Sequence, residues 1–159
     1  MIYKIKKGFH RSTFWPKLTL KDTLVGTFSF IEGFDYSIEK QEDSNKLIGL
    51  SDNWHHHMDS IRIGWRVDPK TPKGVELVSI VYNNGVRKIT SLTHVSVKKD
   101  YPFKIQIFDD EYIIKVNGMA IMLDRTSEWS GIRYQLNPYF GGTTKSPKDV
   151  LIDITLKDS

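Results

Sequence analysis

The sequence predicts a single all-β domain, built as an antiparallel sandwich of two sheets. Short apolar runs with a period of two recur at intervals of about 8–12 residues, which is typical of sandwiches and barrels. Turn residues such as Gly, Pro and Asn separate these runs, and no segment shows the spacing of an amphipathic helix. The length of 159 residues suits one domain over residues 1–159, without an internal repeat or a linker.

The first strand is rich in lysine, which protects a sheet edge from pairing with other chains. Residues 9–20 are interrupted by Pro16 and are expected to be irregular. Gly26 is expected to mark a bulge, and polar loops are predicted at 39–45 and 68–74. The predicted strands, in chain order, are 2–6, 23–31, 47–50, 61–67, 75–82, 86–92, 95–97, 103–108, 111–116, 119–123, 131–140 and 150–156.

Two Asn-Gly pairs, Asn84-Gly85 and Asn117-Gly118, lie between apolar runs and predict hairpins, because both residue types tolerate positive φ. Within each strand, alternate residues point to opposite faces of the sheet. This alternation predicts which side chains fill the space between the sheets. The predicted core residues are Phe28, Phe30, Ile63, Trp65, Val81, Ile105, Ile107, Ile113, Val116, Tyr134, Leu136, Ile152 and Ile154.

The charge balance argues against nucleic acid as a partner. The chain carries 23 basic and 19 acidic residues, a net charge of +4, and the two signs are interspersed. No apolar run approaches the ~20 residues that a membrane-spanning helix needs. There is no cysteine, and the first residues lack the apolar core of a signal peptide. We therefore expect synthesis in the cytosol, with a virion as one destination.

Three segments carry a resemblance to a known superfamily. Residues 101–123 (YPFKIQIFDDEYIIKVNGMAIML) resemble the paired inner strands of concanavalin A-like lectin and glucanase jelly rolls. Residues 134–154 resemble the PYFGG…P-x-D ending of small, largely uncharacterised bacterial and phage members, and residues 46–66 extend the similarity. The resemblance implies a jelly-roll sandwich. Lectins, glycosidases, lyases and virion proteins all share that architecture, so it implies no single activity.

The catalytic patterns of the superfamily are absent. Jelly-roll glucanases carry a catalytic strand of the pattern Glu-x-Asp-x-x-Glu. The last strand here reads Asp149-Val-Leu-Ile-Asp153 and contains no Glu. Alginate lyases combine Gln-x-His, Arg-x-Glu and Tyr-rich strands, and only residues 134–139 are similar to the last. One elimination pair, His55 with Tyr139, stays open because proton abstraction needs only a base and an acid within reach.

Three groups of polar residues are candidate sites. The run from Asp52 to Asp59 holds three consecutive histidines, and in an extended segment His55 and His57 would share a face. Metal binding with Asp52 or Asp59, ligand binding and a purely structural role are the alternatives for this run. We predict neither a bound metal nor a cofactor.

The second group lies on the face of strand 61–67 opposite its apolar residues. There Arg62 and Arg66 flank Gly64, which would leave a gap above the sheet for a carboxylate of an acidic sugar or a partner protein. The alternative is that both arginines are ordinary surface charges. The third group is the predicted polar face of strand 131–140, which a glycan could line: Arg133, Gln135, Asn137 and Tyr139.

These observations predict a non-catalytic binding or interaction module. Its partner is a glycan or a protein surface, such as that of a virion protein, and the sequence leaves its oligomeric state open. Neither nucleic acid nor a membrane is expected as a partner. The alternative is a polysaccharide lyase or glycoside hydrolase with a non-standard site. The predicted binding residues are Trp54, His55, His57, Arg62, Arg66, Arg133, Asn137 and Tyr139.

Overall fold

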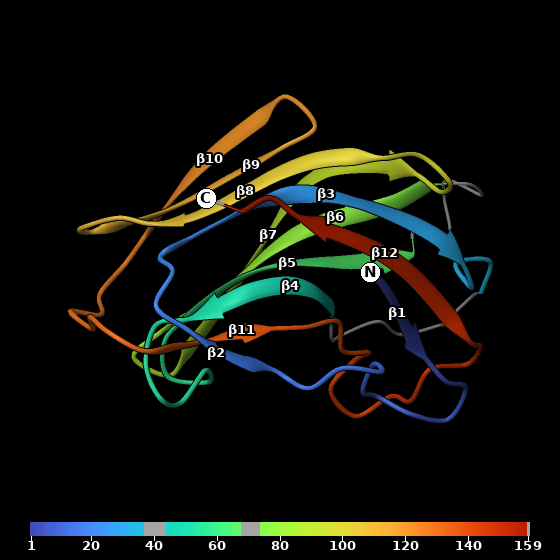
Figure 1. Ribbon diagram of the computed structural model, residues 1–159, viewed down its shortest axis with the longest axis horizontal. Helices are drawn as coiled ribbons and strands as arrows, with labels where there is room; N and C mark the ends of the chain where they lie inside the picture. The colour runs from blue at the N-terminus through green and yellow to red at the C-terminus, as the bar shows by residue number, and fades with distance from the viewer. Residues whose placement is uncertain (37–43, 68–73, 159) are drawn as a thin grey trace.

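The computed structural model of the protein describes residues 1–36, 44–67 and 74–158. These residues form twelve strands in two antiparallel sheets of six strands each, which pack face to face (Figure 1). The predicted all-β sandwich is therefore confirmed. No helix in the described part of the chain is long and apolar enough to cross a membrane.

The two sheets each bring together strands that are distant in the sequence. Sheet A has the spatial order β1 (Ile2–Ile5), β12 (Val150–Leu156), β3 (Thr23–Glu32), β8 (Tyr101–Ile107), β9 (Glu111–Val116) and β10 (Met119–Asp124). Sheet B has the order β2 (Lys17–Thr19), β11 (Arg133–Leu136), β4 (Asn45–Ser51), β5 (Ser60–Val67), β6 (Gly74–Asn83) and β7 (Val86–Ser96). We call the face of sheet B that points away from sheet A its outer face.

Both predicted Asn-Gly hairpins are confirmed. Asn84 and Gly85 have φ of 50° and 81° and connect β6 to β7. Asn117 and Gly118 have φ of 48° and 75° and connect β9 to β10. Positive φ at both central positions gives the turn a twist that matches the twist of the strands it joins.

Several element boundaries differ from those predicted. The segment expected to be irregular contains β2, the two strands predicted at 86–92 and 95–97 form the single strand β7, and the predicted strand 131–140 shortens to β11. The bulge in β3 lies at Ile31, between the pairs Leu151–Glu32 and Ile152–Phe30, and not at Gly26. Of the two predicted loops, 39–45 and 68–74, residues 39–43 and 68–73 lie outside the described residues.

Gly26 instead allows a close approach between strands. A Cβ atom there would lie 2.3 Å from the carbonyl oxygen of Thr155 on β12. This position therefore requires glycine because β12 leaves no room for a side chain, and not because the strand bulges there.

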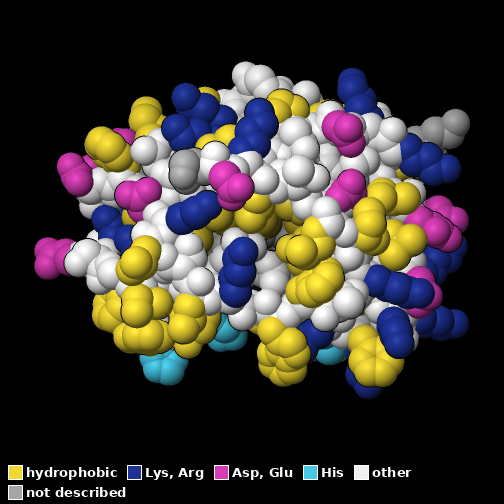
Figure 2. All heavy atoms as spheres, viewed as in Figure 1, with side chains coloured by type: hydrophobic (Ala, Val, Ile, Leu, Met, Phe, Trp, Pro, Cys, Tyr) yellow, Lys and Arg dark blue, Asp and Glu magenta, His cyan; other side chains and the backbone are white. Residues whose placement is uncertain are grey.

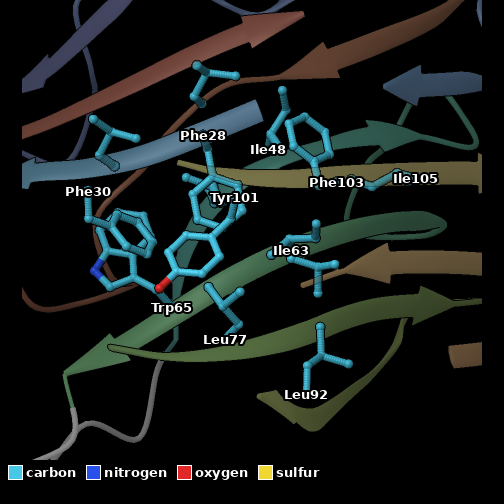
Figure 3. Packing of buried hydrophobic residues seen from close by; sticks show 14 of the residues in the cluster. Phe28, Phe30, Ile48, Ile63, Trp65, Leu77, Leu92, Tyr101, Phe103 and Ile105 are labelled. Carbon is cyan, nitrogen blue, oxygen red and sulfur yellow. The ribbon is translucent and has the colours of Figure 1, made fainter. Parts of the chain in front are cut away.

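The core between the sheets is built around Trp65, which is fully buried. Its ring contacts those of Phe30, Phe34 and Phe140 at centroid distances of 5.8, 6.0 and 6.3 Å. Figure 3 shows side chains from both sheets meeting around this residue. The core residues confirmed among those predicted are Phe28, Phe30, Ile63, Trp65, Val81, Ile105, Ile107, Val116, Ile152 and Ile154.

Two of the predicted core residues, Ile113 and Tyr134, are wrong, and a third, Leu136, is buried but lies outside the cluster between the sheets. On β9 the inward positions are Tyr112, Ile114 and Val116, so Ile113 points outward. Tyr134 and Leu136 lie on the outer face of sheet B, outside the core cluster, although Leu136 is buried. The predicted alternation on β11 has the wrong phase, and the inward side chains of this strand are polar.

The phase of β9 can be tested with two adjacent isoleucines. Ile114→Ala deletes a fully buried side chain, so we expect it to lower the free energy of unfolding by ~2–5 kcal/mol. Ile113→Ala is the matched control on the outward side and should cost clearly less. Urea denaturation of both variants is the measurement, and equal losses would contradict the outward position of Ile113.

Candidate functional site

The outer face of sheet B carries the predicted site residues Arg62 and Arg66 on β5, and its residues form rows that run across the strands. One row is set by the pairs Ser51–Ser60 and Ser60–Tyr82 on β4, β5 and β6, and Tyr134 extends it because its backbone N–H donates to Ser51 Oγ at 2.7 Å. The next row joins Leu136, Gly49, Arg62 and Ile80.

The loop from Asp52 to Asp59 folds against the end of this face. The N–H of Asp52 donates to the carbonyl of Asp59 at 2.9 Å, and the N–H of Met58 donates to the carbonyl of His55 at 2.8 Å. The segment is therefore a compact turn and not an extended strand, so the expectation that only His55 and His57 share a face is wrong. The His56 and His57 rings lie 4.3 Å apart, and the His57 ring lies 5.5 Å from that of Tyr82.

A buried ion pair fixes the start of this loop. Asp52 is fully buried, and Arg125 donates to its carboxylate from Nε at 2.6 Å and from Nη2 at 2.9 Å. Tyr112 on sheet A donates to the same carboxylate at 2.7 Å, while Arg133 Nη2 lies 3.5 Å from it. Burial and the charge of Asp52 raise the pKa of the Tyr112 phenol. A buried charge with this many donors is well compensated.

Beside this anchor, three aromatic rings form a cluster on the surface, which we call the Trp54 cluster. The Trp54 ring packs edge-on against Trp129 at 6.0 Å and against Tyr134 at 5.7 Å, and Trp54 stays 48% exposed. Figure 2 shows hydrophobic side chains and histidines gathered at the lower left of the molecule, where Figure 1 places the loop after β4. Rings held in this way present a preformed apolar surface to a ligand.

Near the middle of the face, two glycines let neighbouring side chains lie flat on the sheet. A Cβ at Gly49 would lie 2.6 Å from Arg62 Cγ, and a Cβ at Gly64 would lie 2.6 Å from the Cδ1 of Ile80. The space above Gly64 is therefore filled by apolar side chains, and the predicted gap between Arg62 and Arg66 is not present.

Arg62 is buried on this face, although the sequence pattern predicts an accessible side chain. Its side chain is only 6% exposed, and neither Nε nor Nη2 has a hydrogen-bond partner. Burial lowers the pKa of the guanidinium to about 10, a shift that the neighbouring Tyr82 partly opposes. Burial also lowers the pKa of His56 to about 4, with a further contribution from the charge of Arg62. The pKa of His57 is lowered by burial, Arg62 and Lys46.

The remaining predicted residues are dispersed. Arg66 donates from Nε to Ser44 Oγ at 2.8 Å and lies 3.9 Å from Glu76. Arg133 points inward to Asp52, so the polar face assigned to its strand is wrong. Asn137 donates to the carbonyl of Trp15 at 2.7 Å and holds the N-terminal segment in place.

Tyr139 lies at the opposite end of the outer face from the Trp54 cluster. It pairs with Lys46 at the start of β4, and its ring stacks on His10 at 5.5 Å. His55 belongs to the loop that follows Ser51. Ser51 is five residues from Lys46 along β4, which separates the two ends of the strand by roughly 16 Å at ~3.3 Å per residue. The structure does not bring the predicted elimination pair, His55 and Tyr139, together.

The histidine loop does not assemble a metal site with its flanking acids. Asp52 is engaged by Arg125, and Asp59 accepts from the N–H of Asn84 at 3.0 Å and from Asn53 Nδ2 at 3.3 Å. Among the residues that the structure describes, no group of three or more His, Asp or Glu side chains could hold a metal ion.

Sequence reasoning missed several residues of this face, namely Lys46, His56, Tyr82, Trp129 and Tyr134. Tyr82 was detectable, because it follows the outward positions of β6 by strict alternation. Trp129 and His56 were not, because they depend on how two loops fold against each other.

The sequence matches no protein-family model and no curated protein. Similar solved structures exist for the fold. The alginate lyase AlyC3 matches with a TM-score of 0.69 at 12% identity, over 98% of this chain and 73% of that one. The same enzyme in complex with dimannuronate matches with a TM-score of 0.68, also at 12% identity, over 98% and 72%.

A GH16 protein from Bacteroides ovatus, in complex with a mixed-linkage glucan product, matches with a TM-score of 0.55 at 11% identity, over 96% of this chain and 77% of that one. These neighbours are jelly-roll sandwich proteins, in agreement with the superfamily resemblance seen in the sequence. At this level of identity the likeness shows the fold alone.

The anchor at Asp52 yields a prediction for stability. Asp52→Asn leaves Arg125 partly unpaired in a buried setting, and we expect the free energy of unfolding to fall by ~3–5 kcal/mol. Asp35→Asn is the matched control, since it removes an exposed carboxylate that pairs with Lys148 and surface pairs contribute little. Similar urea midpoints for the two variants would contradict the role of Asp52 as an anchor.

The histidines yield a prediction for pH. An unfolded histidine titrates near pH 6.5, whereas His56 in the folded protein has its pKa lowered to about 4. The unfolded state therefore takes up the proton first as pH falls, and the free energy of unfolding decreases between about pH 6.5 and 4.

We expect His56→Asn to lose less stability over this interval than the wild type. The measurement is the urea midpoint across the interval and at neutral pH, with His55→Asn as the control for loss of an imidazole. Parallel curves for wild type and His56→Asn would show that His56 does not contribute.

Proposed function

We propose that the protein is a non-catalytic carbohydrate-binding module, and that a sugar chain binds on the outer face of sheet B against the Trp54 cluster. The observation that carries this proposal is the half-exposed indole of Trp54, which packs edge-on against Trp129 and Tyr134. A fixed aromatic ring offers apolar contact to the C–H faces of a sugar at little cost in side-chain entropy.

The polar groups around the cluster suit the hydroxyls of a sugar. Tyr82 lies in the same row of the face as Tyr134, and His57 lies against Tyr82. Binding sites for small molecules combine aromatic walls with a few such groups that fix orientation. The solved structures that share the fold include enzymes named for their action on alginate, and one of them was solved with dimannuronate.

The acidic residues of this face favour binding over hydrolysis. Glycoside hydrolases use two carboxyl groups on either side of the scissile bond. On the described part of the outer face, Glu76 is 3.9 Å from Arg66. Asp149 and Asp153, which flank and lie within β12, belong to sheet A, where they pair with Lys4 and the N-terminal amine.

One observation favours a second candidate, a polysaccharide lyase. His57 and Tyr82 have ring centroids 5.5 Å apart, and burial, together with the charge of Arg62, lowers the pKa of His57. A neutral imidazole could take the proton next to a uronate carboxylate while a phenol protonates the leaving oxygen. This pair replaces the predicted pair of His55 with Tyr139.

Glycan binding can be tested with an array of plant, algal and bacterial polysaccharides, followed by affinity measurements on the best ligand. We expect Trp54→Ala to weaken binding by roughly tenfold or more, as for a central aromatic contact. Phe9→Ala is the matched control, because Phe9 is an exposed aromatic residue whose backbone bonds Lys6 and Ser146, away from the Trp54 cluster.

The outcomes separate the candidates. If the wild type binds no polysaccharide on the array, and its signal equals that of Trp54→Ala, glycan binding is contradicted. Release of unsaturated products, seen as ultraviolet absorbance that His57→Ala abolishes, would replace the binding module with the lyase. The virion role expected from the sequence stays a prediction, since neither the fold nor the site bears on it.

A further inference from the structure

Arg62 is a buried cation with an unpaired hydrogen-bonding edge. It is more than nine-tenths buried, and its Nε and Nη2 atoms are closed to water and lack hydrogen-bond partners. A buried charged group without partners is costly, so side chains of this kind are nearly always paired. The unpaired edge is therefore a feature that calls for a ligand.

The protein itself shows what this edge binds. Arg125 uses the same two atoms to hold the carboxylate of Asp52, from Nε to Oδ2 at 2.6 Å and from Nη2 to Oδ1 at 2.9 Å. The spacing of Nε and Nη2 matches the two oxygens of a carboxylate, which makes such pairs both strong and directional. Arg62 offers this edge without a carboxylate partner among the described residues.

The surroundings of Arg62 also favour an anion. Arg62 acts on His56 and His57, and in both histidines every contributing charge is that of a basic group, Lys46 among them. Burial lowers the pKa of Arg62 itself and the phenol of Tyr82 opposes that shift, and no carboxylate of the described residues contributes. The two cations Arg62 and Lys46 act on the same histidines, and the positive potential that they create favours a negative ligand.

We propose that Arg62 binds the carboxylate of an acidic sugar, so that the glycan recognised by this face is a uronate polymer. The inference rests on the proposed function and names its substrate class. Arg62 lies two strands and two residues from Tyr134, a distance of roughly 12 Å from the spacing of strands and residues in a sheet. One oligosaccharide can therefore stack on the Trp54 cluster and place a carboxylate at Arg62.

Access to Arg62 requires a small movement. Because Nε and Nη2 are closed to water, a neighbouring side chain must turn aside when the ligand enters. Changes of side-chain rotamer of this kind are common at binding surfaces whose backbone stays fixed. The backbone beneath is held by β4 and β6 on either side of β5.

The test uses isothermal titration with three fragments of equal length. The first is an oligouronate, the second is the same oligouronate after reduction of its carboxyl groups to hydroxymethyl groups, and the third is a sulfated neutral oligosaccharide. We expect the wild type to bind the first and to bind the other two at least roughly tenfold more weakly, since a hydrogen-bonded charged group contributes that much.

Two substitutions at Arg62 sharpen the test. Arg62→Met keeps most of the length of the side chain and removes its charge, and we expect it to weaken oligouronate binding by roughly 10- to 100-fold. Its melting temperature should equal or exceed that of the wild type, because an apolar residue replaces an unpaired buried charge. Arg62→Lys keeps the charge without the planar edge and should restore only part of the affinity.

Arg66→Met is the matched control, because Arg66 lies on the same strand face but is paired with Ser44 and Glu76. Equal binding of the intact and reduced oligouronates would overturn the inference and leave the proposed function standing. Preference for the sulfated fragment would overturn the choice of a carboxylate. Should Arg62→Met fail to fold, the comparison of intact and reduced fragments on the wild type still decides.

Discussion

The outer face of sheet B depends on one interaction, the buried pair of Asp52 with Arg125. Asp52 directly follows β4, Arg125 follows β10 at the edge of the other sheet, and Tyr112 from the interior of sheet A donates to the same carboxylate. The pair therefore joins the two sheets at one end of the sandwich. Because Arg125 also donates to the carbonyl of Trp129 at 2.8 Å, it places the aromatic residue that supports Trp54.

The fold could be predicted from the sequence because sandwiches follow a local rule. Alternation in strands such as β5 places Ile63 and Trp65 in the core, and this placement does not depend on the rest of the chain. The Asn-Gly turns are equally local, since their φ values depend on two residues. The rule failed on β11, where Arg133 points inward. Its partner there, Asp52, lies 81 positions away in the sequence, and no local pattern reports such a partner.

The site was less predictable than the fold, for two physical reasons. The histidine loop was treated as extended, but hydrogen bonds from Asp52 to Asp59 close it into a turn and bring His56 beside His57. Arg62 was placed on the correct face, but its burial depends on Gly49, which lets the arginine stem lie flat across the neighbouring strand. Composition and spacing carry no signal for either contact.

The two arginines nearest to these loops show how one side chain serves structure and recognition. Arg125 has its carboxylate in the same chain, and the resulting pair is part of the folded state. Arg62 has the same donor edge, equally shielded from water, but it faces the outer surface and not the space between the sheets. A fold that needed only stability would gain by replacing Arg62 with an apolar residue of similar size, since Val78, Ile80 and Leu136 already form an apolar surface around it. The cost of keeping a guanidinium there is understandable if its partner comes from outside the chain.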